Sequence, residues 1–212
     1  MSPVLLFVLF AAALFAAYIG TRLALRADAA RPAANGVRRS STARLVRCAV
    51  IAAVYVALCL VLQPFSYGAV QVRVAEMLCL LPVFGAEYIV GVTLGCFLAN
   101  LLGVSLGTTV AVDIVFGTLA TLLACLCTYK LRRFRVKGLA LPASLPPVVF
   151  NAVIVGAEIT IFFTDGGFVW PVFLFNMLTV GLGEIISCCI LGVALVKLIE
   201  ANPRLKATFT EG

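Results

Sequence analysis

The sequence predicts an all-α integral membrane protein, built as a six-helix bundle with one additional transmembrane helix before it. Of its 212 residues, 63% are hydrophobic and 12% are charged, and the mean hydropathy is +1.16. Soluble domains are roughly half apolar, and about a quarter of their residues are charged. A chain of this composition cannot give a soluble globule a polar surface, and its length accommodates six or seven spans of about 20 residues each.

Apolar runs separated by turn-forming residues give the position of each span. The first run, residues 4–20, contains no charged residue and has no basic region before it, so we expect a retained span rather than a cleaved signal peptide. Proline, glycine and polar residues interrupt the apolar sequence that follows. The six expected bundle spans cover residues 46–63, 70–83, 85–102, 111–129, 142–163 and 171–197. The second is short for a bilayer crossing, and we expect it to tilt or to cross only part of the way.

Three clusters of basic residues set the expected orientation. Seven of the 16 lysines and arginines lie in residues 22–47, five in 130–137 and three in 197–206. With six spans between the first cluster and the last, all three fall on one side of the membrane, and their positive charge marks that side as cytoplasmic. Arg73 is the one left over and falls on the outer side. Because these clusters account for the net charge of +7, we expect membrane lipid around the chain and no nucleic-acid partner.

The chain divides into three segments on this basis. Residues 1–43 contain the additional helix and a basic cytoplasmic connector. Residues 44–200 form the six-helix membrane domain, and residues 201–212 form a cytoplasmic tail.

The eight cysteines are expected to be packing residues. All lie in apolar runs, no two form a CxxC pair, and the chain contains no histidine. Metal sites and disulfide frameworks need characteristic cysteine and histidine spacings, whereas a free cysteine in an apolar helix is a small, polarizable packing residue. We therefore expect no metal site and no catalytic residues.

Polar residues within the predicted spans point to a binding site near the outer surface. A charged side chain at the bilayer centre costs on the order of 3 kcal/mol, so such residues usually face a bundle interior and serve a function. Most of those in this chain fall in the outer half of their spans, although they come from five different spans. We therefore expect a polar pocket that opens to the outside. The candidate substrate-binding residues are Gln71, Arg73, Glu76, Asn100, Asp113, Asn151, Glu158, Trp170, Asn176 and Glu184.

Structural explanations remain open for some of these residues. Arg73 and Glu76 are three residues apart and can form a salt bridge that fixes one helix end. Asn100 and Asp113 can cap helix ends. If they do form a site, carboxylates outnumber Arg73, which suits a ligand that donates hydrogen bonds or carries positive charge, or a path for protons or cations.

Small residues mark one face of the first bundle span. Ala49, Ala53 and Ala57 are spaced by four and form a smooth stripe that lets another helix approach closely. This stripe can pack inside the bundle or form the docking face for a partner membrane subunit.

The central sequence resembles the QueT family. The motifs that carry the resemblance are GAVQVRVAE, GCFLANLLG and DIVFGTLATLL, and the similarity extends over about residues 44–200. Members of this family are described as queuosine-precursor transporters that act as substrate-binding S components of energy-coupling factor (ECF) transporters. In this sequence the matching motif residues are Gln71, Arg73, Glu76, Asn100 and Asp113.

The resemblance implies a fold, a substrate and partners. It implies a six-helix S component in a bacterial cytoplasmic membrane, which captures a 7-deazaguanine such as preQ0, preQ1 or queuine from outside. It implies a transmembrane coupling subunit, which would meet the Ala49, Ala53 and Ala57 stripe, and two ATPase subunits. The chain has no GxxxxGK[ST] motif and needs no cofactor of its own, since the partners would hydrolyse ATP. The family fold does not need residues 1–43.

Other functions remain open. The chain is alternatively an S component for another vitamin-like molecule, or a stand-alone proton-coupled transporter that uses Asp113, Glu158 and Glu184 as a relay. A membrane enzyme is less well supported, because there is no histidine and no HExxH motif.

Overall fold

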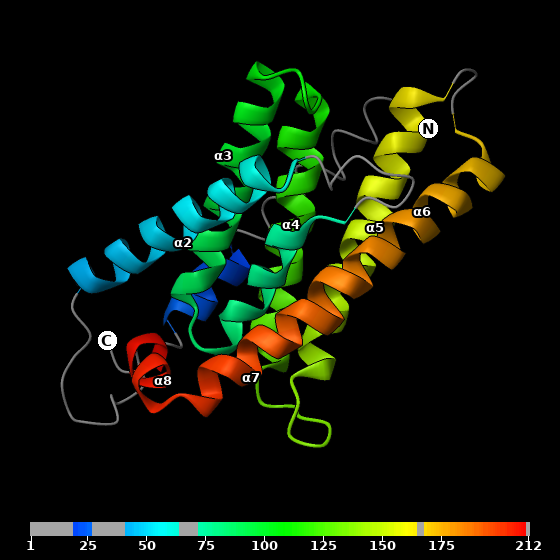
Figure 1. The fold of residues 1–212 in the computed structure, drawn as a ribbon. Coiled ribbons are helices and arrows are strands. Elements are labelled where there is room, and N and C mark those ends of the chain that lie inside the picture. The colour runs from blue at the N-terminus through cyan, green and yellow to red at the C-terminus, as the bar shows by residue number, and fades with distance from the viewer. Residues whose placement is uncertain (1–18, 27–40, 64–71, 165–167, 211–212) are drawn as a thin grey trace.

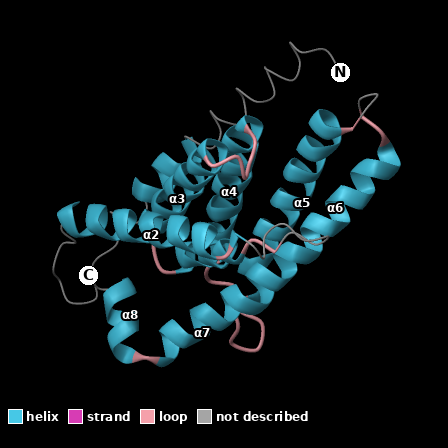
Figure 2. Ribbon diagram, turned by 45° about the horizontal axis from the view of Figure 1, so that its top comes forward, coloured by secondary structure: helices cyan, strands magenta, loops and turns pink. Residues whose placement is uncertain are grey.

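The computed structural model describes residues 19–26, 41–63, 72–164 and 168–210, and these residues form a helical bundle (Figure 1). The elements in chain order are α2 (Ser41–Val61), η2 (Val74–Val83), α3 (Glu87–Ser105), α4 (Ala111–Leu131), α5 (Leu141–Phe163), α6 (Trp170–Glu184), η3 (Ile185–Gly192), α7 (Val193–Ala201) and α8 (Pro203–Thr210). Figure 2 shows that the described residues contain helices and loops but no strand. The all-α prediction is confirmed.

Within the described residues, five helical stretches are long and apolar enough to cross a membrane. They are Thr42–Val61, Glu87–Ser105, Ala111–Leu131, Leu141–Phe163 and the continuous run Trp170–Ala201. The expected spans agree with them to within a few residues at most ends, and the chain is a multi-pass membrane protein. Most of the first expected span, residues 4–20, lies outside the described residues. Residues 19–26 are helical, and the Ala24 carbonyl accepts a hydrogen bond from the Tyr129 hydroxyl of α4 at 3.4 Å.

The second expected span is the short helix η2. It is a ten-residue 3₁₀ helix, and at a rise of about 2.0 Å per residue it extends about 20 Å. The hydrocarbon core of a bilayer is about 30 Å thick, so η2 is too short to cross it, as its sequence led us to expect. It packs against η3, a π-helical stretch in the last span. A methyl group added at Gly192 of η3 would lie 3.1 Å from the Met77 carbonyl of η2, so the two backbones are close.

Glycines bring α2 and α3 into near contact. A methyl group added at Gly91 would lie 3.0 Å from the Cys48 carbonyl, and one added at Gly95 would lie 2.6 Å from Tyr55 Cβ. Small residues at a helix crossing let two backbones approach, which gains van der Waals contact where no hydrophobic driving force exists between helices. This close crossing fixes the position of Tyr55, which is 1% exposed.

Basic residues and helix ends meet at one end of the bundle, here called the basic end. Arg47 of α2 forms an ion pair with Glu87 at the start of α3, at 3.6 Å, and Arg135 after α4 pairs with Glu200 of α7, at 2.7 Å. The other end contains the end of α2, the start of η2 and the turn between α3 and α4, and is called the opposite end.

The predicted tail is helical and folds back onto the basic end. Phe209 of α8 packs beside the rings of Phe84 and Tyr88, with centroids 5.8 and 5.5 Å away. The Tyr88 hydroxyl donates a hydrogen bond to the Phe209 carbonyl at 3.1 Å, and Arg47 donates one to the Thr208 carbonyl at 3.3 Å. Helix α8 therefore covers the bundle where α2 and α3 begin.

Candidate substrate-binding site

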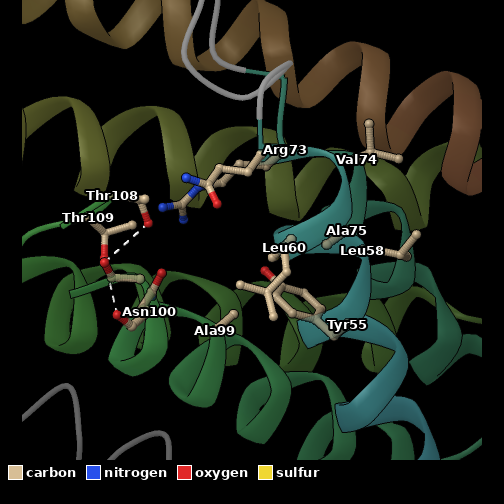
Figure 3. A pocket seen from close by; sticks show the side chains of 13 residues that line it. Tyr55, Leu58, Leu60, Arg73, Val74, Ala75, Ala99, Asn100, Thr108 and Thr109 are labelled. Carbon is tan, nitrogen blue, oxygen red and sulfur yellow. Dashed lines mark hydrogen bonds between the residues drawn. The ribbon is translucent and has the colours of Figure 1, made fainter. Parts of the chain in front are cut away.

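A partly open pocket lies at the opposite end of the bundle, between the ends of α2 and α3 and the start of η2 (Figure 3). It contains about 540 Å³ of empty space, including space that opens to the outside. Its lining comes from α2 and the segment just after it, from the start of η2, from α3, and from the turn between α3 and α4. The lining residues are Tyr55, Leu58, Cys59, Leu60, Gln63, Arg73, Val74, Ala75, Ala99, Asn100, Gly103, Thr108 and Thr109.

Glu76 is held firmly next to this pocket. The Tyr55 hydroxyl donates to its Oε1 at 2.5 Å, the Cys79 thiol donates to its Oε2 at 2.8 Å, and Thr121 lies 3.5 Å from Oε1. Glu76 is 1% exposed, and buried polar groups are generally hydrogen-bonded. Donors from α2, η2 and α4 therefore already occupy both oxygens of this carboxylate.

Asn100 and Asp113 shape the turn between α3 and α4. Asn100 Nδ2 donates to the Asp113 carbonyl at 2.9 Å, and the Thr109 hydroxyl donates to the Asn100 carbonyl at 3.1 Å. The Asp113 carboxylate accepts a hydrogen bond from the Val110 backbone N–H at 3.2 Å and so caps α4. The capping role left open for Asp113 is confirmed. A methyl group at Gly117 would lie 3.1 Å from Asn100 Nδ2, so this glycine leaves room for the Asn100 side chain.

A second set of polar residues lies on α5 and at the end of α6. Asn151, Glu158 and Glu184 are 3%, 2% and 4% exposed. Glu184 Oε2 accepts a weak hydrogen bond from the Cys188 thiol at 3.4 Å. Both oxygens of Glu158, and Asn151 Nδ2, are buried without a hydrogen-bond partner. Glu158 lies five residues before the end of α5, about 7.5 Å along the helix axis, which agrees with the expected position in the outer half of the span.

Arg73 connects the two sets. Asp113 and Glu76 lie near enough for their charges to act on Arg73, and Arg73 lies near enough to act on Glu158 and Glu184. No described carboxylate forms a direct ion pair with its guanidinium, so the Arg73–Glu76 salt bridge that their spacing allows is not formed. The positive charge of Arg73 therefore acts on four carboxylates. Together these carboxylates offer more hydrogen-bond acceptors than the guanidinium of Arg73 satisfies.

The family relationship follows from a match over most of the bundle. The family model described as QueT transporter matches residues 45–201, which is well over half of the chain. The chain belongs to the QueT transporter family.

A curated relative in this family has a more specific name. The queuosine precursor transporter QueT of Lactococcus lactis subsp. cremoris (strain MG1363) is 39% identical to this chain over 88 residues, which cover 41% of this chain and 49% of the relative. The match therefore spans about half the length of the curated relative. No solved structure matches the chain.

The names of the family and of the relative are those of transporters, in agreement with the expectation that the chain is not an enzyme. Residues 103–107, GVSLG, do match the GxSxG spacing of hydrolase nucleophiles. Ser105, however, ends α3 and donates its hydroxyl to the Leu101 carbonyl at 3.2 Å, and the chain has no histidine to act as a base.

The QueT motif residues and the other predicted site residues lie in different places. Arg73, Glu76, Asn100 and Asp113 come together at or beside the pocket. Gln71, the remaining motif residue, lies outside the described residues.

Two predicted residues on α6 lie apart from the pocket lining. Trp170 is 66% exposed and packs edge-on against Phe168 and Phe173. Asn176 Nδ2 donates to the Thr160 hydroxyl at 3.1 Å and so joins α6 to α5. Their part in substrate binding stays a prediction.

Sequence reasoning missed several residues that hold the site together. The clearest is Tyr55, whose buried hydroxyl fixes Glu76. A tyrosine within an otherwise apolar span is a signal that was available, because a buried tyrosine hydroxyl usually has a hydrogen-bond partner. Cys79 and Thr121, which also contact Glu76, carry no such signal, since both residue types are common in helix packing.

Proposed function

We propose that the protein captures a 7-deazaguanine queuosine precursor from outside the cell, as the substrate-binding S component of an ECF transporter. The observation that carries this proposal is the pocket at the opposite end of the bundle, whose Arg73 is linked electrostatically to four buried or half-buried carboxylates. The name of the Lactococcus relative supports a queuosine precursor as the substrate.

The chemistry of the pocket suits such a ligand. A 7-deazaguanine is a flat base with adjacent ring N–H and amino donors, and carboxylates accept such donors without offering any of their own. The rings and methyl groups of Tyr55, Leu58 and Ala99 provide apolar walls for the flat faces. A site built from a few polar groups in an apolar wall rejects analogues that leave those polar groups unpaired.

The distribution of charge supports capture from outside. Positive residues concentrate on the cytoplasmic side of membrane proteins, and in this chain they gather at the basic end, around Arg47 and Arg135. The pocket lies at the other end, so in this orientation its mouth would face outside in a bacterial cytoplasmic membrane.

The exposed face of α2 supports a partner in the membrane. Ala49, Ala53 and Ala57 are all exposed on the bundle surface, so internal packing does not cover them. A stripe of small residues allows close approach of another helix, which suits the coupling subunit of an ECF transporter. Because the chain has no P-loop motif, two ATPase subunits would supply ATP hydrolysis.

Uptake of labelled preQ1 by bacterial cells tests this proposal. Cells without their own precursor transport would express the chain either alone or with an ECF coupling module. We expect accumulation only with the module, and we expect Ala53→Leu to reduce it roughly tenfold, since a larger side chain separates two closely packed helices. Val149→Leu enlarges an exposed side chain on α5, away from the alanine stripe, and as the control should leave uptake unchanged. Uptake without the module, abolished by collapsing the proton gradient, would instead favour a stand-alone transporter.

A further inference from the structure

We propose that Glu158 is the carboxylate that selects the ligand, by accepting two hydrogen bonds from the adjacent ring N1–H and 2-amino group of a guanine-type base. This inference rests on the proposed function and assigns to one residue a task that four carboxylates could share.

Glu158 has unused acceptors in a buried position. The residue is 2% exposed, and neither Oε1 nor Oε2 has a hydrogen-bond partner. Burying a polar group without a partner costs several kcal/mol in general, and buried polar atoms in native structures are nearly always bonded. Two free oxygens on one planar carboxylate match two parallel donors on one edge of a planar ligand.

The other carboxylates of the group are already occupied. Glu76 accepts from Tyr55 and Cys79. Asp113 accepts from the Val110 backbone N–H at the start of α4. Glu184 accepts from the Cys188 thiol. Each of these three carboxylates therefore accepts at least one hydrogen bond from a donor within the bundle, whereas neither oxygen of Glu158 accepts one.

The surroundings of Glu158 connect it to the pocket. Asp113 and Arg73 both lie near enough to act on its charge. Arg73 also lines the pocket and, as Figure 3 shows, extends from the start of η2 towards the side of Thr108. A ligand that contacts Arg73 therefore contacts a side chain whose charge also acts on Glu158. Two hydrogen-bond donors on a ligand favour the charged carboxylate, which is the form that accepts both hydrogen bonds.

The test compares two ligands that differ only in the 2-amino group, 7-deazaguanine and 7-deazahypoxanthine. Purified wild-type protein and the variants Glu158→Gln, Glu184→Gln and Glu76→Gln would be titrated with each in detergent. We expect wild-type protein to prefer 7-deazaguanine about 100-fold or more, because a site built to bond an amino group strongly disfavours a ligand that lacks it. We expect Glu158→Gln to reduce this preference to within about threefold, since glutamine offers one acceptor where the ligand presents two donors.

The ratio of the two affinities separates ligand selection from folding. Glu184→Gln and Glu76→Gln can weaken binding of both ligands, but we expect them to keep the preference. A Glu158→Gln protein that keeps the wild-type preference, or a loss of preference in Glu184→Gln or Glu76→Gln instead, would overturn the assignment while leaving the proposed function standing. Wild-type protein that binds neither 7-deazaguanine nor any queuosine precursor would overturn both.

Discussion

Replacing Arg73 with glutamine is expected to lower the free energy of unfolding by about 3 kcal/mol, more than any other single change at the site. Arg73 is the only lysine or arginine between Arg47 and Lys130, and its charge acts on Glu76, Asp113, Glu158 and Glu184. Removing one partner of a buried ion pair commonly costs about 3–5 kcal/mol, because the partner of opposite charge stays buried without compensation. The lower end of that range applies, since Arg73 is only half-buried and forms no direct ion pair with any described carboxylate.

Thermal unfolding in detergent measures this effect. Arg133→Gln is the matched control, because Arg133 is exposed beyond the end of α4, and its loss should leave the melting temperature unchanged. Equal stability of wild-type protein and Arg73→Gln would show that Arg73 does not balance these carboxylates.

Gly95→Ala is expected to have the second largest effect. The added methyl group would lie 2.6 Å from Tyr55 Cβ, closer than real Cβ atoms approach, and 3.1 Å from Ala52 Cα, so α2 must move away from α3. Overpacking of this kind costs about 1–3 kcal/mol. Because Tyr55 moves with α2, its 2.5 Å hydrogen bond to Glu76 should also weaken. We therefore expect a lower melting temperature and weaker ligand binding together.

Gly181→Ala is the matched control for this prediction. Its methyl group would lie 3.5 Å from Ala152 Cβ, which is an ordinary van der Waals contact. Alanine has the higher helix propensity, by about 1 kcal/mol, so this variant should be as stable as the wild-type protein or more so. If Gly95→Ala behaved like Gly181→Ala, the close crossing of α2 and α3 would not be a determinant of stability.

The positions of the helices could be predicted from the sequence because the signals are local. Apolar runs and turn residues placed the span 142–163 within one residue of Leu141–Phe163. The helix types of η2 and η3 could not be predicted, because they depend on contacts between segments about 110 residues apart, such as the Cys188 thiol and the Glu76 carbonyl at 3.3 Å. Helix α8 was likewise not expected, since its order comes from Phe209 packing against Phe84 and Tyr88.

The candidate site was predictable in its residue types but not in its pairings. The cost of placing Glu76 or Glu158 in a bilayer was enough to mark both as candidates. Sequence spacing suggested that Arg73 pairs with Glu76, yet Tyr55, 21 residues away, is the partner of Glu76. The unused acceptors of Glu158 also have no sequence signal, because they depend on which donors the folded bundle brings to each carboxylate.

Equilibrium binding to the purified protein tests the central claim most directly. The chain alone, in detergent and without partner subunits, would be titrated with preQ0, preQ1 and queuine, with adenine as the comparison. The account predicts saturable binding of at least one of the three precursors and none of adenine, whose Watson–Crick edge offers an acceptor where a guanine-type base offers the ring N–H. The absence of binding of all three precursors to folded protein would contradict the account.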